Sequence, residues 1–249
     1  MSAPFPVSAI PRGPVPVPVA VGRLAGSRSI TPVWRNELGG LTFRLGEGTE
    51  AQYVKWLAIG TSEIDLQAEA ERLTWARRWI TVPSVIDQGD DADGRWLVTA
   101  AVPGRSAVDP QWVARPAITA AAIGQGLRMQ HDALPVAECP FDWSVERRVE
   151  CSTTGMSESL AEPPSINQLV VCHGDACAPN TLLHDDGTFA AHVDLGALGV
   201  ADRWADLAVA AWSTEWNYGP GYEEIVYSAY GIAADAERIA YYRKLWDAT

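Results

Sequence analysis

The first hundred residues carry the alternation of apolar and polar positions that is typical of β-strands. Two such runs, 41–45 and 51–56, flank a glycine-containing turn at 46–48, and a third run covers 95–102. Successive side chains of a strand point to opposite faces, so these runs predict strands with one buried face. We expect a small antiparallel sheet here, with the segment 87–94 forming turns before the last strand.

Helical periodicity dominates the rest of the chain. After Ser62, a candidate N-cap, apolar residues recur at Leu66, Ala70 and Leu73, which places them on one face of a helix. Residues 117–131 show the clearest helical pattern, and the chain is again helical in character from Asp202 onward. Between these two regions, strand character returns only at 169–172 and across 181–194.

These patterns predict an α+β protein with a β-rich N-lobe, a mostly helical C-lobe and a cleft between them. We expect a proline-rich, extended leader at 1–33, an N-lobe at 34–99, a hinge at 100–104 and a C-lobe at 105–249. The leader is expected to be extended because its first 18 residues contain the prolines Pro4, Pro6, Pro11, Pro14, Pro16 and Pro18.

The net charge of −12 argues against nucleic acid or an anionic membrane surface as a partner, since phosphate binding needs Lys and Arg. It is compatible with attraction of cationic small molecules into an acidic cleft, although a charge that only keeps the protein soluble is the more common case. No run of 18 apolar residues predicts a membrane span, and no signal peptide is indicated. Four cysteines without metal-binding spacing, at 139, 151, 172 and 177, indicate reduced thiols and a cytoplasmic location. A monomer and a dimer remain equally open.

The richest chemistry lies around a predicted hairpin that turns at 185–187. Antiparallel pairing about this turn places residue 180 beside 193 or 194, so the side chains of Asn180 and Asp194 should meet. An amide oxygen and a carboxylate suit Mg²⁺, and Asp175, in the preceding loop, could accept a proton from a hydroxyl. Each residue alone is more often a turn or cap residue. His173 is expected to fix the loop by hydrogen bonds, with metal ligation as the alternative.

Residues 173–180, His-Gly-Asp-Ala-Cys-Ala-Pro-Asn, and 194–203, Asp-Leu-Gly-Ala-Leu-Gly-Val-Ala-Asp-Arg, resemble motifs of the aminoglycoside phosphotransferase family, especially the 3′- and 3″-phosphotransferases. The resemblance implies a protein-kinase-like fold and an ATP- and Mg²⁺-dependent transfer of phosphate to a hydroxyl. The acceptor would be an aminoglycoside-like antibiotic or a related cationic or sugar alcohol. In this reading Asp175 positions or deprotonates the hydroxyl, and Asn180 and Asp194 hold Mg²⁺.

The resemblance also implies residues for nucleotide binding. Lys55 would contact the phosphates and pair with Glu69, which lies on the apolar face of its predicted helix; the alternative is that both are surface charges. The adenine would lie against the main chain of the hinge from Ala100 to Val102, and residues 36–40 would cover the phosphates. Asp206 would brace the catalytic loop.

Three departures from the family pattern concern the acceptor. Ala197 stands where relatives often carry Arg, the segment 140–172 is short, and the C-terminal acidic pair and aromatic of relatives are replaced by Trp-Asp-Ala-Thr. We therefore expect a more open acceptor pocket and weaker use of aminoglycosides. Glu215 and Asp247 are the candidate acidic contacts and Trp216 a candidate pocket wall, although tryptophans at helical spacing more often pack in a core.

Two other classes compete with the kinase. A catalytically silent, nucleotide-binding relative with a regulatory role would keep the fold, but such proteins usually lack one of the five residues Lys55, Glu69, Asp175, Asn180 and Asp194. A metal-dependent phosphohydrolase needs several clustered His and Asp ligands, and the four histidines show no such spacing.

Overall fold

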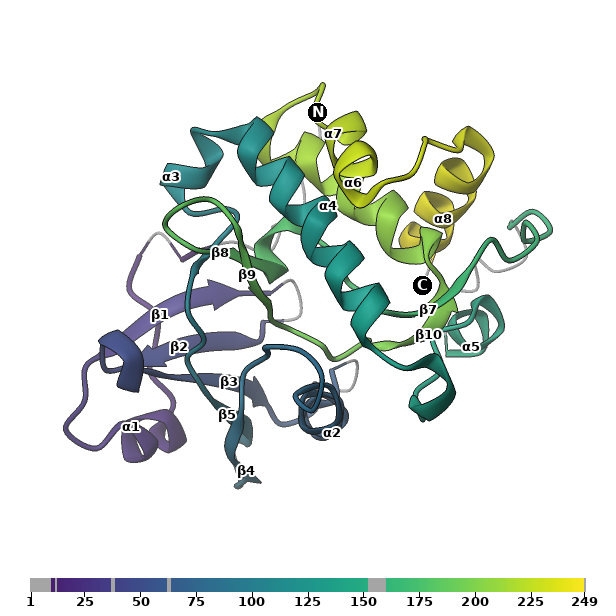
Figure 1. The fold of residues 1–249 in the computed structure, drawn as a ribbon. Coiled ribbons are helices and arrows are strands. Elements are labelled where there is room, and N and C mark those ends of the chain that lie inside the picture. The colour runs from purple at the N-terminus through teal and green to yellow at the C-terminus, as the bar shows by residue number, and fades with distance from the viewer. Residues whose placement is uncertain (1–9, 12, 37–38, 62–63, 152–159, 249) are drawn as a thin grey trace, which may run out of the picture. The chain divides into compact units, whose positions relative to one another are not determined.

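The structure, a computed structural model, describes residues 10–11, 13–36, 39–61, 64–151 and 160–248. The chain divides into two compact units, residues 1–77 with 83–102 and residues 78–82 with 103–249. The first is rich in strands and the second in helices, which confirms the predicted α+β class (Figure 1). None of the helices in the described part is long and apolar enough to cross a membrane.

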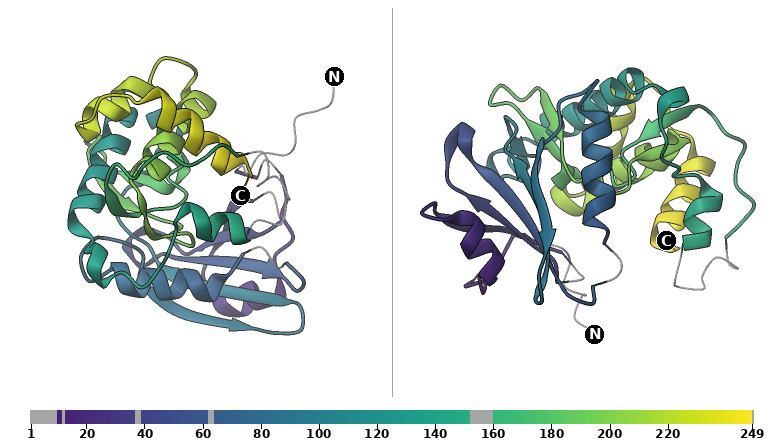
Figure 2. Two further views of the ribbon diagram at one scale, coloured as in Figure 1. Left: turned by 90° about the vertical axis from the view of Figure 1, so that its right-hand side faces the viewer. Right: turned by 90° about the horizontal axis from the view of Figure 1, so that it is seen from below.

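The first unit is built on one antiparallel sheet with the strand order β1-β2-β3-β5-β4. Its strands are β1 Ile30–Arg35, β2 Leu41–Leu45, β3 Gln52–Ala58, β4 Val85–Asp90 and β5 Gly94–Ala100, and its helices are α1 Val19–Ala25 and α2 Leu66–Ala76. Helix α1 packs on the face that carries Phe43 and Val54. Lys55 follows Val54 and so points to the other face, where it meets α2. The two helices therefore cover opposite faces (Figure 2).

The expected extended leader is wrong in its second half. Residues 1–9 and 12 lie outside the described residues, but α1 and β1 both begin before residue 34. The dense prolines end at Pro18, which leaves Val19–Ala25 free to form a helix that starts directly after a proline. Pro32 is tolerated in β1 because β1 is an edge strand and its pairing shifts register between Pro32 and Trp34.

Two further differences concern element boundaries. The segment 87–94, expected to form turns, begins with the second half of β4. This edge strand is mostly exposed, so it shows no apolar alternation. Helix α2 begins at Leu66 rather than after Ser62, which itself lies outside the described residues. Its cap is Asp65, whose Oδ1 accepts the main-chain amides of Gln67 and Ala68 at 3.0 Å each.

The second unit packs helices around two small sheets. Its helices are α3 Pro110–Val113, α4 Pro116–Ala133, α5 Val145–Cys151, α6 Trp204–Tyr218, α7 Glu223–Tyr230 and α8 Ala236–Ala248. Strands β6 Arg105–Ser106, β8 Thr181–Leu183 and β9 Phe189–His192 form one sheet; β7 Leu169–Cys172 pairs with β10 Gly199–Asp202 in the other. Helix α4 packs against α7 and α6 (Figure 1), and the core between them is apolar. The sequence pattern did not predict β10.

Candidate active site

The loop between β7 and β8 holds Asp175 and Asn180 together. Asn180 Nδ2 donates to the main-chain oxygen of Asp175 at 2.9 Å and to its carboxylate Oδ2 at 3.0 Å. The other carboxylate oxygen, Oδ1, is buried and has no strong donor in the described part of the chain, where the neighbouring Cys177 thiol is only a weak one. A buried acceptor without a strong donor is costly, so this oxygen is suited to a hydroxyl supplied by a ligand.

The β8–β9 hairpin has the register that the sequence predicts. Thr181 pairs with His192, and the amide of Val193 donates to the main-chain oxygen of Asn180 at 3.0 Å. Asp194 follows with φ of 63°, the one positive φ outside glycine among the described residues. Such strain at a non-glycine residue is typical of functional sites. Asn180 and the residue before Asp194 thus lie side by side at the end of the hairpin.

This end of the hairpin fits a magnesium ion chemically. Because Asn180 directs its amide nitrogen to Asp175, its side-chain oxygen is turned away and free to bind a cation. Asp194 adds a carboxylate, and amide and carboxylate oxygens are the ligands that Mg²⁺ prefers.

His173 fixes the loop by hydrogen bonds, as expected. Its Nε2 contacts the main-chain oxygen of Val193 at 3.0 Å, and its Nδ1 accepts the amide of Asp175 at 3.3 Å. The first contact requires a proton on Nε2 and the second a lone pair on Nδ1, which defines the tautomer. With both ring nitrogens in use and the side chain fully buried, His173 is a structural residue and not a metal ligand.

Asp206, at the start of α6, braces the same loop, which confirms its expected role. Its Oδ2 accepts the amide of His173 at 2.6 Å and its Oδ1 accepts the amide of Gly174 at 2.9 Å. The carboxylate is fully buried. Burial by itself raises its pKa, but the hydrogen bond from His131, the charges of the nearby histidines and the Gly174 amide lower the pKa below its ordinary value.

Helix α6 also holds the far end of the loop. Ser213 Oγ accepts the amide of Ala178 at 2.8 Å. The neighbouring Cys177 thiol has a pKa raised well above its ordinary value, first by burial and then by the charge of Asp175. It therefore stays protonated beside that carboxylate.

In the first unit, Lys55 and Glu69 form the expected ion pair. Lys55 Nζ donates to both carboxylate oxygens of Glu69, at 2.7 and 2.8 Å. The Glu69 side chain is 5% exposed and that of Lys55 26% exposed, which leaves the ammonium reachable by a ligand. This geometry excludes the alternative that the two residues are ordinary surface charges.

In the hinge, two of the main-chain amides predicted to face the adenine are already used in hydrogen bonds within the protein. The amide of Ala100 donates to the main-chain oxygen of Ser84 at 2.9 Å, and that of Ala101 donates to Ala51 at 3.0 Å. Of the predicted adenine contacts, Val102 therefore keeps the available amide. In the candidate phosphate loop, Asn36 Oδ1 accepts the amide of Gly40 at 2.6 Å; residues 37–38 lie outside the described part.

The candidate acceptor residues lie on α6 and α8. Trp216 is 47% exposed and packs on Trp212 and Trp246, with ring centroids 4.7 and 5.6 Å away. Glu215 and Asp247 are exposed, and partial burial raises the pKa of Asp247. The three indoles form a cluster with one open face, so packing and a pocket-wall role are both compatible with the arrangement.

Sequence reasoning missed two histidines that belong to this network. His131 and His192, to which the sequence analysis assigns no role, are both buried and hydrogen-bonded beside the catalytic loop. A signal was present: Gln130 and His131 follow Leu127 by three and four residues, so they continue the buried face of α4. Two consecutive polar residues on such a face need partners.

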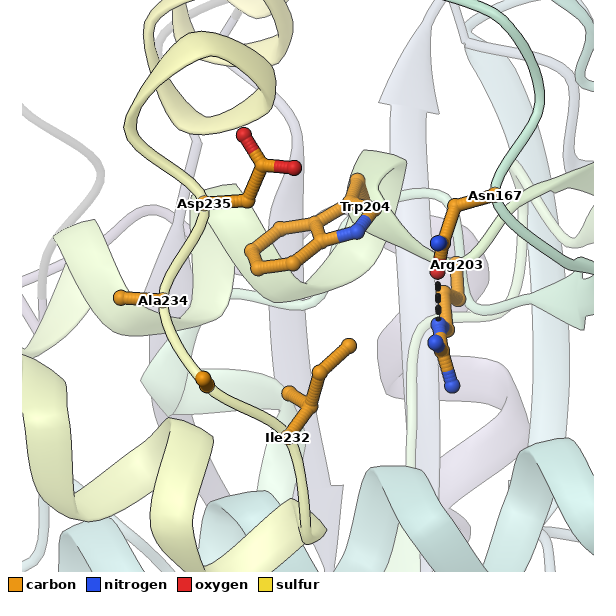
Figure 3. A pocket seen from close by; sticks show the side chains of 7 residues that line it. Asn167, Arg203, Trp204, Ile232, Ala234 and Asp235 are labelled. Atoms are coloured by element: carbon orange, nitrogen blue, oxygen red, sulfur yellow. Dashed lines mark hydrogen bonds between the residues drawn. The ribbon is translucent and has the colours of Figure 1, made fainter.

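A pocket of about 530 Å³ lies elsewhere in the second unit (Figure 3). The side chain of Arg203 lines it and donates from Nε to Asn167 Oδ1 at 2.6 Å, and the indole of Trp204 forms one wall. Ile232, Ala233, Ala234 and Asp235 complete the lining. It contains none of the predicted site residues.

Comparisons with known proteins agree with this geometry. Residues 157–242 match the model of the phosphotransferase enzyme family. The chain is 34% and 36% identical to the aminoglycoside 3′-phosphotransferases of Streptomyces fradiae and Streptomyces ribosidificus, with 83% of this chain and 90% of each relative covered. Among solved structures it is similar to APH(3″)-Id of Streptomyces rimosus in complex with ADP and streptomycin. The TM-score is 0.66 at 27% identity, covering 90% of this chain and 94% of that one.

Proposed function

Because the chain belongs to the aminoglycoside phosphotransferase family, which has a protein-kinase-like fold, we propose that it transfers the γ-phosphoryl group of ATP to a hydroxyl of an aminoglycoside-like, cationic small molecule. The observation that carries the proposal is the Asp175 carboxylate: one oxygen is held by Asn180, and the other is buried with no donor stronger than the Cys177 thiol nearby. A cytoplasmic location, where ATP is available, is part of the proposal.

Asp175 binds the acceptor in this mechanism. The hydroxyl donates to Oδ1, which orients the acceptor oxygen for in-line attack on the γ-phosphorus. As the new P–O bond forms, the bond to the β-phosphate oxygen breaks, ADP leaves, and the hydroxyl proton passes to Asp175. The hydrogen bond that Asn180 donates to its carboxylate, and the one that its own amide donates to His173 Nδ1, hold this residue in place and so limit the reorganisation needed during the reaction.

Each unit, taken by itself, carries candidate residues for nucleotide binding. Lys55, oriented by Glu69, would neutralise the α- and β-phosphates, and the amide of Val102 would contact the adenine. Asn180 and Asp194 would hold Mg²⁺, which supplies charge neutralisation for the phosphates when it is bound.

For the acceptor, the exposed face of Trp216 would stack against a ring, with Glu215 and Asp247 attracting its ammonium groups. The position of Ser213 supports this assignment. Ser213 contacts the catalytic loop at Ala178, and Trp216 follows it by three residues, one turn further along nearly the same face of α6.

The test is ATP consumption by the pure protein with Mg²⁺ and a panel that includes kanamycin and streptomycin. We expect turnover with at least one acceptor, and D175N should lower kcat by roughly 10²–10⁴-fold with little change in the KM for ATP, because Asp175 contacts the acceptor. The exposed Asp185 on the hairpin turn provides the control, D185N. ATP binding without turnover on any acceptor would favour the silent alternative instead.

A further inference from the structure

A buried histidine, His131, lies in the last turn of helix α4, beside the residue that braces the catalytic loop. His131 Nε2 lies 3.0 Å from Asp206 Oδ2, and its Nδ1 lies 2.9 Å from the hydroxyl of Tyr230 on α7. All three side chains are buried. They form a continuous hydrogen-bonded path from α7 through α4 to the start of α6.

Asp206 at one end of this path and Tyr230 at the other determine where the protons of His131 lie. Asp206, a carboxylate with a lowered pKa, can only accept, so His131 carries a proton on Nε2. Burial raises the pKa of Tyr230, which keeps its hydroxyl protonated and able to donate to Nδ1. Tyr230 thus selects the tautomer of His131 that donates to Asp206.

Asp206 connects His131 to the catalytic loop by hydrogen bonds. The oxygen that accepts from His131 also accepts the amide of His173, and the second oxygen accepts the amide of Gly174. Asp175 is the next residue in the chain. A rotation of the Asp206 carboxylate would therefore move the two amides that precede Asp175.

A metal site is the alternative use of this cluster, because the ligand atoms of His131, Cys172 and Asp206 lie within 4.8 Å of one another. The chemistry argues against it. The Cys172 thiol donates to the main-chain oxygen of Asp202 at 3.4 Å, and burial raises its pKa well above the ordinary value, whereas a metal needs the thiolate. His131 has both ring nitrogens in hydrogen bonds.

We propose that His131 is a positioning residue for phosphoryl transfer, acting through Asp206 on the placement of Asp175, with Tyr230 fixing its tautomer. The proposal rests on the proposed function. It concerns the rate of the chemical step, because none of the three residues touches the nucleotide or the acceptor in the mechanism above.

The test compares two substitutions, each of which replaces only one of the two ring nitrogens of His131 with an amide nitrogen. In H131Q the amide nitrogen replaces Nε2 and can still donate to Asp206; in H131N the side chain reaches only as far as Nδ1 and loses Asp206. With MgATP and either kanamycin or streptomycin, we expect kcat of H131Q within about threefold of wild type and kcat of H131N lower by roughly 10–100-fold, with the KM for ATP unchanged in both. Y230F, which retains the Asp206 contact, should lose only a few-fold in kcat.

The control is T119V on the same helix. Thr119 is also buried and donates to the main-chain oxygens of Trp112 and Arg115, but it lies 12 residues from His131, about 18 Å along the helix axis. It should lose stability without losing kcat. Wild-type kcat in folded H131N, or equal losses in folded H131Q and H131N, would overturn the inference.

If H131N does not fold, H131Q decides alone: a loss of more than tenfold in kcat in the folded protein contradicts the proposal, and near-wild-type kcat supports it. Failure of the proposed function is distinguishable, because wild type itself would then show no turnover with any acceptor while T119V and H131Q still bind ATP.

Discussion

Gly174 is constrained both by its own backbone and by its neighbour. Its φ of 86° lies in the left-handed region, and a Cβ built on it would stand 2.1 Å from the main-chain oxygen of Ala197. The loop after Asp194 thus places both the backbone and the Cβ of Ala197 against the residue before Asp175. Any side chain at 174 must therefore displace one of the two loops.

G174A should accordingly impair both stability and turnover. The control is G60A, because Gly60 has φ of 88° with nothing within 4 Å of an added Cβ. Left-handed backbone costs alanine about 1–2 kcal/mol at either site, and the clash at 174 should add roughly 1–3 kcal/mol. Urea unfolding and kcat measure the two effects. Equal destabilisation by both substitutions, with kcat kept, would show that the loops separate easily.

At the scale of elements, Asn180 and Asp194 lie at the same end of the β8–β9 hairpin. Asn180 is neutral, whereas Asp194 carries a negative charge. D194A should abolish the Mg²⁺-dependent part of ATP binding, because the neutral Asn180 cannot hold the ion alone. ATP titrations with and without Mg²⁺ measure this, with D186A on the exposed turn of the same hairpin as control. A wild-type metal enhancement in D194A would place the ion elsewhere.

Helix α2 depends on β3 for the partner of its buried carboxylate. E69Q keeps the shape of Glu69 but removes the charge that orients Lys55, so kcat/KM for ATP should fall roughly 10–100-fold. E71Q, on the exposed side of the same helix, should leave it unchanged. The outcome against this assignment would be an unaltered kcat/KM in E69Q, since Lys55 would then be positioned without Glu69.

Helices and strands with a regular apolar pattern could be predicted from the sequence. Short or exposed strands that form only by pairing with a neighbouring strand could not. Helix α4 and the hairpin register follow from periodicity and from the turn at 185–187. β4 is an exposed edge strand and β10 is a short strand held by β7, so neither carries a pattern of its own. The site followed the same rule: Asp175 and Asn180 belong to a motif, whereas periodicity places His131 on the buried face of α4 without showing that its partner is Asp206 of α6.

For the whole molecule, the burial of neutral His192 links stability to pH. Burial disfavours the charged imidazole and so lowers the pKa of His192 well below its ordinary value. Its Nδ1 contacts Gln130 Oε1 at 2.8 Å, and its Nε2 is buried without a hydrogen-bond partner in the described structure. A proton added to Nε2 would have no acceptor there.

The sign of the pH effect follows from this depressed pKa. Below about pH 6.5 the unfolded chain binds a proton at His192 that the folded chain does not. The free energy of unfolding should therefore fall by up to about 1.4 kcal/mol for each unit by which the pH is lowered. Urea unfolding at pH 7, 6 and 5 measures the slope. H192N retains a donor for Gln130 without titrating, so its slope should be smaller; an identical slope would assign the effect to other groups.

Helix α6 contacts the catalytic loop at both ends, through Asp206 and, two turns later, through Ser213, while Trp212 and Trp216 pack on each other beside these positions. Seven residues advance a helix by about 10 Å and return to nearly the same face, so one rigid stripe carries the chemistry. Under the proposed acceptor contact at Trp216, substitutions at Trp212 and Trp216 should alter acceptor preference while Asp206 and Ser213 keep the catalytic loop in place. For directed evolution, this divides α6 into positions to keep and positions to randomise.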